Sequence, residues 1–170
     1  MFPDQSHKSD TFQKMPIKHL LCGLFVTPTK NKICYSFIII EIHRYIDNFH
    51  QYFFNLPPDN DYIKWTVGKA MYMADGTALK QKQALDENGF YSDIISSSAV
   101  CTIICDSIQF DEHTRRFNYY GTQIIKRRTR DLRRSMLTTG SIENVPRTQN
   151  NPHGLMITNW RTLENKDLDY

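Results

Sequence analysis

Apolar side chains recur at three- and four-residue spacing from residue 41 onward, which is the period of an amphipathic helix. The stripe comprises Ile42, Tyr45, Ile46, Phe49, Phe53 and Leu56. Pro57 and Pro58 end this helix, because proline lacks an amide donor and restricts the residue before it. Residues 1–40 show no consistent period. We therefore expect an irregular N-terminal arm over 1–40 and one domain over 41–170.

Two further helices are predicted before residue 90. Asp59 or Asn60 offers a side-chain oxygen that caps the second helix. One face of that helix carries Ile63, Val67, Ala70, Met71 and Ala74. Asp75-Gly76 breaks it, and a more polar third helix runs over 77–88 with Gly89 as its left-handed cap. The apolar residues Phe90, Tyr91, Ile94 and Ile95 follow, and we expect them to pin the third helix to a sheet.

Strand-forming residues dominate after Ser98. The predicted strands cover 99–111, 116–128, 132–145 and 155–163. The first strand alternates imperfectly, which indicates a bulge or burial on both faces. Turn residues at 112–114 and a dense turn signal over 146–154 separate the strands. A run of helices followed by a meander of strands predicts the α+β class.

The composition limits the classes of protein that this chain can be. Hydrophobic residues make up 40% of the 170 residues, which is enough for a buried core, and a net charge of +3 is too small to indicate nucleic-acid binding. The apolar runs over 20–26 and 33–40 are too short for a membrane helix, which needs about 20 residues. The four cysteines have neither CxxC nor metal-finger spacing, so we expect free thiols.

Candidate catalytic and metal-binding groups are few. His43, Asp47 and His50 share one helix face, but one face alone rarely completes a metal site, and we favour the polar flank of a helix. Cys101 or Cys105 with His153 is a nucleophile–base pair that nothing nearby activates. The sequence has no Gly-rich phosphate loop, no GxSxG and no HExxH. We therefore expect no enzyme activity, metal, cofactor or small-molecule substrate.

The most basic segment of the chain is residues 126–134, with six Lys or Arg in nine positions. It is able to contact phosphates, with Phe117, Tyr119 and Tyr120 nearby as stacking platforms for bases. The simpler interpretation is a solvated hairpin turn between two strands. Arginine is also common in protein interfaces, which gives a third interpretation.

Several short strings occur in order along the chain. They are Phe49-His50 with Phe53-Phe54, Leu56-Pro57-Pro58-Asp59, AMYMAD over 70–75, Glu87-Asn88-Gly89-Phe90-Tyr91 with Ile94-Ile95-Ser96, Asp106-Ser107-Ile108, Leu137-Thr138-Thr139, Asn150-Asn151-Pro152-His153-Gly154 and Leu163-Glu164-Asn165-Lys166-Asp167-Leu168. In this order and spacing, over 42–168, the chain resembles the TraK proteins of Bacteroides-type conjugative transposons.

The resemblance implies a fold, a location and a role. TraK proteins are similar to the inner-membrane scaffold component of type IV secretion systems, which has a cytoplasmic tail, one membrane helix and a periplasmic domain. That domain has the nuclear-transport-factor-two-like fold, in which helices pack on a curved four-stranded antiparallel sheet. It is not an enzyme, and it contacts copies of itself and other transfer subunits. Residues 1–40 depart from the family's N-terminus, so we expect that the gene is divergent or truncated there.

We expect a scaffold subunit, periplasmic and associated with the inner membrane, that binds other conjugative transfer subunits and forms a homo-oligomer. Its predicted core is Ile42, Ile46, Phe49, Phe53, Ile63, Val67, Met71, Ile104, Ile125, Leu137, Ile157 and Trp160. The predicted partner surface consists of Arg127, Arg128, Arg130 and Arg133 together with the loop around His153. A nucleic-acid-binding module that uses residues 126–134 is the alternative, and a small-molecule enzyme is a third hypothesis.

Overall fold

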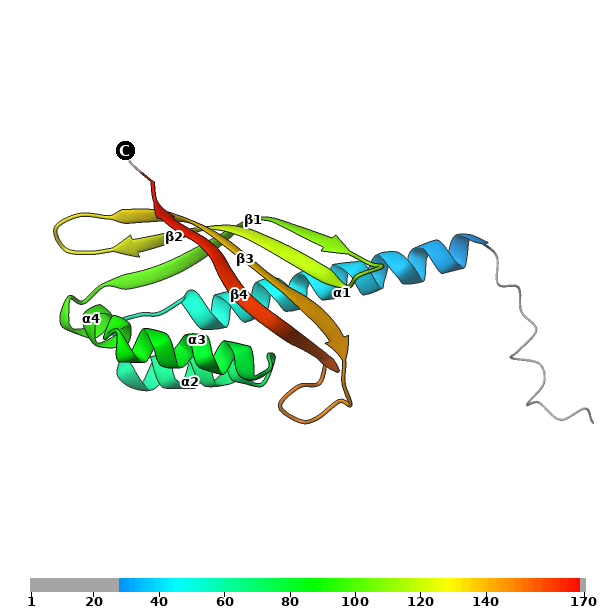
Figure 1. Cartoon of the computed structure of the whole chain (residues 1–170), viewed down its shortest axis with the longest axis horizontal. Coiled ribbons are helices and arrows are strands. Elements are labelled where there is room, and N and C mark those ends of the chain that lie inside the picture. The colour runs from blue at the N-terminus through cyan, green and yellow to red at the C-terminus, as the bar shows by residue number, and fades with distance from the viewer. Residues whose placement is uncertain (1–27, 169–170) are drawn as a thin grey trace, which may run out of the picture. The chain divides into compact units, whose positions relative to one another are not determined.

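A computed structural model of the chain describes residues 28–168, with side chains described from Phe37 onward. Within these residues four helices precede four strands (Figure 1). The helices are α1 (Pro28–Phe54), α2 (Asn60–Met71), α3 (Gly76–Glu87) and α4 (Phe90–Ser96), and the strands are β1 (Val100–Asp111), β2 (Arg116–Lys126), β3 (Leu132–Asn144) and β4 (Leu155–Asp167). This order confirms the predicted α+β class.

The strands form one antiparallel sheet in the order β1-β2-β3-β4, so each strand pairs with its neighbour in the sequence. The register of β1 against β2 shifts between Cys105 and Ser107, which is the irregularity that the imperfect alternation predicts. The β3–β4 pair has two further shifts, near Thr138 and Gly140. Bulges increase the local twist of a sheet, and the strands in Figure 1 are visibly twisted.

Helix α1 supplies the largest part of the core. Its side chains Tyr45, Ile46, Phe49 and Phe53 are at most 1% exposed. They pack with one face of the sheet, represented by Phe117, Tyr119, Ile142, Ile157 and Trp160. The ring of Phe49 meets that of Trp160 edge to face at 4.9 Å between centroids. Burying a large apolar side chain stabilises a fold by about 1.5–3 kcal/mol, so this stripe contributes much of the domain's stability.

A second cluster joins α2 and α4 to the first two strands. It contains Leu56, Ile63, Val67, Tyr91, Ile94, Ala99, Cys101 and Ile125. Helix α2 begins as predicted, because the Asp59 side chain accepts a hydrogen bond of 2.8 Å from the Tyr62 amide. Gly89, with φ of 72°, is left-handed as expected and separates α3 from α4. The apolar stretch predicted after Gly89 is thus the short helix α4.

Two helix boundaries differ from the prediction. Helix α1 begins at Pro28, so the expectation of irregular structure is wrong for 28–40, while 1–27 lie outside the described residues. Proline suits the first position of a helix, and neither glycine nor proline interrupts 29–54. At the other end Leu56 has left the helix, and its amide and carbonyl both pair with Cys101 at 2.9 Å.

The predicted core is confirmed for most positions and wrong for Ile104, which is 51% exposed. Its neighbour Ile103 points inward, because successive side chains of a strand face opposite sides of the sheet. Met71 and Leu137 are half-buried. None of the helices in residues 28–168 combines the length and apolar character that a membrane crossing requires.

Candidate protein interface

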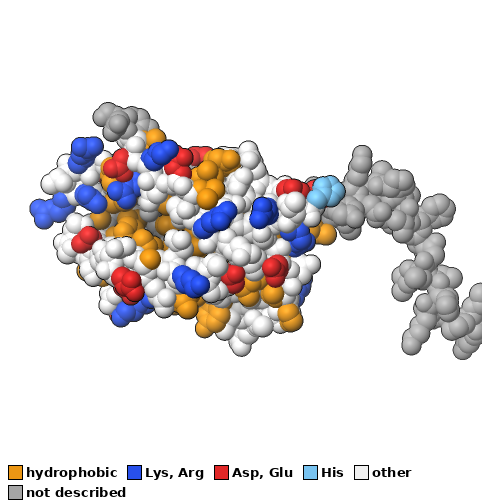
Figure 2. All heavy atoms as spheres, in the orientation of Figure 1, with side chains coloured by type: hydrophobic (Ala, Val, Ile, Leu, Met, Phe, Trp, Pro, Cys, Tyr) orange, Lys and Arg blue, Asp and Glu red, His pale blue; other side chains and the backbone are white. Residues whose placement is uncertain are grey.

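The basic segment forms the hairpin between β2 and β3. Arg127, Arg128 and Arg130 are exposed in the loop, and Arg133 is exposed near the start of β3. Figure 2 shows Lys and Arg side chains gathered around this hairpin, with Asp and Glu among them. Arg134 Nε lies 2.6 Å from Asp167 Oδ1 on β4, so its charge is already compensated within the chain. The loop arginines therefore offer a cationic surface of modest size.

His153 lies in the loop between β3 and β4. Its Nδ1 is 2.6 Å from Glu41 Oε1 on α1, and its ring meets the Tyr45 ring edge to face at 5.5 Å. Both members of the Glu41–His153 pair are partly exposed, with side-chain exposures of 46% and 37%. A histidine–carboxylate pair on an open surface lacks the enclosed cleft that a catalytic pair requires.

The structure does not bring the arginine segment and His153 together into one surface. They lie beyond opposite ends of β3, whose 13 residues extend roughly 40 Å at about 3.3 Å per residue. The prediction of one combined surface is therefore corrected to two separate ones. The strand predicted over 132–145 lies between the two groups, so its length already implied this separation.

Asn151 fixes the conformation of the β3–β4 loop, a role that the sequence did not reveal. Its side-chain amide donates hydrogen bonds to the carbonyls of Leu155, at 2.6 Å, and Tyr72, at 3.4 Å. It also donates to the Tyr45 hydroxyl at 3.3 Å. Asn151 is 5% exposed, whereas Pro152 and His153 beside it are exposed. The buried Asn151 side chain thus attaches the exposed β3–β4 loop to α1.

The three groups considered for a metal have separate partners. His50 is fully buried, with Nδ1 2.7 Å from the Ile46 carbonyl and Nε2 2.7 Å from Thr138 Oγ1. His43 Nδ1 bonds to the Ile39 carbonyl, and Asp47 accepts from Gln51. Within residues 28–168 no group of three or more His, Cys, Asp or Glu side chains is placed to hold a metal ion.

His50 is a structural group in an aromatic environment. Its ring stacks on Tyr119 at 3.7 Å between centroids, with an interplanar angle of 2°. A carbonyl only accepts hydrogen bonds, so Nδ1 carries the proton and Nε2 accepts from the Thr138 hydroxyl. Burial lowers the pKa of His50 to about 3, which keeps the ring neutral at physiological pH.

The aromatic and cysteine candidates are also accounted for by the core. Phe117 and Tyr119 are at most 1% exposed, so of the three aromatics in the stacking alternative these two are not accessible to bases. They face α1 because they alternate with the outward residues of β2. Burial raises the pKa of the Cys101 thiol to about 11, which disfavours a nucleophilic thiolate. Cys101 pairs with Ile125 beside the basic hairpin, so it lies at the opposite end of the sheet from His153.

An exposed aromatic strip along α2 and its C-cap residue was missed by the sequence reasoning. Tyr62, Trp65 and Tyr72 are 46%, 53% and 54% exposed. The Lys69 amino group lies 3.9 Å from the Trp65 ring centroid and 5.7 Å from that of Tyr52. The signal was present, because positions 62, 65, 69 and 72 have helical spacing on the side away from Ile63 and Val67. Exposed Trp and Tyr are typical of contact surfaces.

Comparison with solved structures identifies the fold. The chain is similar to the soluble domain of the TrwG type IV secretion machinery from Bartonella grahamii, with a TM-score of 0.60, 17% identity, and 76% of this chain and 96% of that chain covered. It is also similar to the VirB8 protein of Agrobacterium tumefaciens, with a TM-score of 0.63, 10% identity and coverage of 77% and 94%.

An IcmL-like type IV secretion system protein from Legionella pneumophila matches with a TM-score of 0.57, 6% identity and coverage of 77% and 94%. The chain therefore has the VirB8-like version of the nuclear-transport-factor-two-like fold, which confirms the predicted fold class. No protein-family model matches the chain, and no curated protein matches it either.

Proposed function

We propose that the chain is a non-catalytic structural subunit of a bacterial conjugative transfer apparatus, of the TraK type found in Bacteroides-type conjugative transposons. In this role it belongs to the periplasmic side of the inner membrane, binds other transfer subunits and associates with copies of itself. The fold likeness to TrwG and VirB8 supports a place in type IV secretion machinery. The strings shared with TraK proteins support the conjugative type.

One observation carries the non-catalytic part of this proposal: helix α1 fills the face of the sheet where a related fold would need a cavity for a substrate. Phe49, Phe53 and Trp160 occupy that space, and each is at most 2% exposed. The polar groups buried there, such as His50 and Thr138, bond to one another instead of pointing into a cleft. What remains accessible is surface suited to protein contacts.

Transfer frequency between cells tests the proposal. The gene is deleted from an element that carries it, and plasmid-borne variants are supplied in trans. We expect deletion to abolish transfer, the original chain to restore it, and Phe49→Asp to fail because the domain does not fold. Unchanged transfer after deletion overturns the proposal. Sedimentation of the purified chain measures the expected self-association. If the chain is a monomer at all concentrations, the proposed association with copies of itself is wrong.

Nucleic-acid binding is the second candidate function, because the arginines of the β2–β3 hairpin are exposed. Phe117 and Tyr119 are buried, which leaves Tyr120 as the one partly exposed aromatic of the three named for stacking, so such binding depends mainly on phosphate contacts. Each phosphate neutralised on double-stranded DNA contributes a slope of about −0.9 in a plot of log affinity against log salt. Titration of labelled DNA at several salt concentrations therefore separates the candidates. If the magnitude of the slope is smaller by about 3 in the triple variant Arg127→Ala/Arg128→Ala/Arg130→Ala, the nucleic-acid-binding function is supported. If the chain does not bind DNA, that function is excluded.

A further inference from the structure

A groove of about 350 Å³ separates helices α2 and α3. Its α2 wall includes Asn60, Lys64, Gly68 and Met71, and its α3 wall includes Leu79, Lys82 and Asp86. Ile63, Val67 and Tyr91 complete the lining, which is mostly apolar. From Asn60 to Met71 the wall is eleven residue steps long, which is about 16 Å at 1.5 Å per residue. That length matches about three turns of another helix.

Gly68 stands in the wall of this groove without an explanation in the fold. A Cβ added at Gly68 meets no atom within 4 Å, so the position does not require glycine for close packing within the chain. Glycine inside a helix costs roughly 0.5–1 kcal/mol relative to alanine. The effect of the missing side chain is to leave space in the groove, at the place where a partner's backbone would approach.

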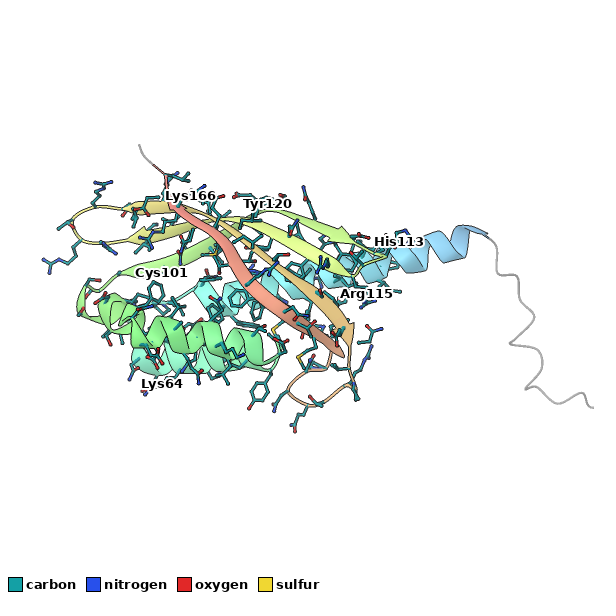
Figure 3. All side chains as sticks on the ribbon, in the orientation of Figure 1. Lys64, Cys101, His113, Arg115, Tyr120 and Lys166 are labelled. Carbon is teal, nitrogen blue, oxygen red and sulfur yellow. The ribbon has the colours of Figure 1, made fainter. Side chains whose placement is uncertain are left out.

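Two polar groups of the groove lack partners among the described residues. Tyr91 is 8% exposed, and its hydroxyl has no hydrogen-bond partner. Lys64 is exposed and forms none of the ion pairs within 28–168; it extends from α2 at the edge of the molecule in Figure 3. Lys82, by contrast, lies 3.7 Å from Asp86. A hydrogen-bond acceptor with negative charge would pair with Lys64.

We propose that this groove binds an amphipathic helix of another protein, which places apolar side chains between α2 and α3 and an acidic side chain beside Lys64. A helix in a groove buries its apolar face against apolar walls, as Ile63, Val67, Met71 and Leu79 provide. The net positive charge of Lys64, Lys82 and Asp86 selects an acidic partner. Trp65, on the adjacent side of α2, extends the contact surface.

This inference rests on the proposed scaffold role, because it names the kind of transfer subunit that the scaffold holds. The test uses the full chain in cells that carry the transfer element. A photo-cross-linking amino acid replaces Leu79 at the exposed rim, and the same substitution at exposed Ser107 on the sheet is the matched control. Mass spectrometry then identifies the attached peptide.

We expect a product at position 79 and not at 107, attached to an amphipathic segment of another protein that contains Asp or Glu. Gly68→Leu, which fills the groove, and Lys64→Glu should each lower the yield by about tenfold, the equivalent of about 1.4 kcal/mol. Reversing the partner's acidic residue to Lys should restore the yield with Lys64→Glu. Gly68→Ala keeps most of the space and should have a smaller effect than Gly68→Leu.

Several results would overturn the inference. These are no product at position 79, a product unaffected by Gly68→Leu, attachment to a second copy or to this chain's own residues, and an attached segment without an acidic residue. A melting curve of each variant checks that it is folded. If Gly68→Leu does not fold, Lys64→Glu still tests the inference. Transfer frequency in the same strains separates the two proposals: the scaffold role survives if deletion abolishes transfer while the groove variants do not change it.

Discussion

Helices α1 and α3 differ in how much of each the rest of the domain covers. In α1, the side chains of Tyr45, Ile46, Phe49 and His50 are all 0% exposed. In α3, Ala78 is the buried residue, and Leu79 is 45% exposed. Two helices of one small domain can therefore serve different purposes, one holding the sheet and the other presenting surface.

The attachment of α3 shows how a largely exposed helix stays in place. Asp75 caps it by accepting a 2.9 Å hydrogen bond from the Thr77 amide, and its second oxygen accepts from the Asn159 amide at 3.1 Å. The Thr77 hydroxyl accepts from the Trp160 amide at 2.9 Å. These bonds tie the first turn of α3 to β4. The remaining turns are free to line the groove with α2.

Phe49→Asp on α1 should have the largest effect on the stability of the domain, because Phe49 is fully buried. Truncation of a buried Phe costs about 3–5 kcal/mol, and an unpaired buried carboxylate adds to that cost. We expect the domain to unfold, seen as loss of the cooperative transition in circular dichroism. Trp65→Asp on the exposed side of α2 is the matched control, with a change of about 0.5 kcal/mol. An unchanged melt for Phe49→Asp would show that the placement of α1 is wrong.

His50 should make the α1 layer sensitive to acid. Its folded pKa is depressed to about 3 by burial, whereas a histidine in the unfolded chain has a pKa of about 6.5. The unfolded state therefore binds the proton more tightly, and the stability that neutral His50 provides is present above about pH 6.5 and is lost as pH falls toward about 3.

Between pH 7.5 and 4.5 the loss from this group is about 2–3 kcal/mol, since each pH unit contributes up to about 1.4 kcal/mol. The measurement is the free energy of unfolding against pH for the original chain and His50→Gln. The difference in stability between the two should narrow as the pH falls. Thr138→Val is the control, because it removes the hydrogen-bond partner but keeps the titrating ring. A difference that stays constant with pH would contradict the role given to burial.

Asn151→Ala should loosen the β3–β4 loop from α1 with an intermediate effect. It removes one donor to the Leu155 carbonyl and to the Tyr45 hydroxyl, which still bond to each other at 2.5 Å. A hydrogen bond within a protein contributes about 0.5–1.5 kcal/mol to stability, so the loss of the short bond to Leu155 should cost about 1 kcal/mol. Chemical denaturation measures the change, and exposed Asn150→Ala is the neighbouring control. Equal effects of the two substitutions would show that Asn151 does not anchor the loop.

The fold was more predictable from the sequence than the surface, and the reason lies in periodicity. The apolar stripe from Ile42 to Phe53 has the period of a helix, and the alternation in β2 has the period of a strand. Each pattern therefore indicates which side chains are buried. The predicted stripe of α1 extended to Leu56, but the helix ends at Phe54. Backbone pairing of Leu56 with Cys101, which is distant in the sequence, outweighs the local helical pattern. The separation of His153 from the arginine hairpin follows from the predicted strand over 132–145, whose length the prediction of a single partner surface left out of account.

Alanine substitutions at two glycines should have the smallest effects on the stability of the domain, and the expected signs are opposite. At Gly68 a Cβ meets open space, so Gly68→Ala should stabilise the domain by about 0.5–1 kcal/mol through better helix propensity. At Gly121 in β2 a Cβ would lie 2.9 Å from the Ile104 carbonyl oxygen and 2.7 Å from the Tyr119 ring, so Gly121→Ala should destabilise it. Paired thermal melts measure both. If Gly68→Ala lowers the melting temperature, then space beside α2 is needed within the chain itself, and the groove is not held open for a partner.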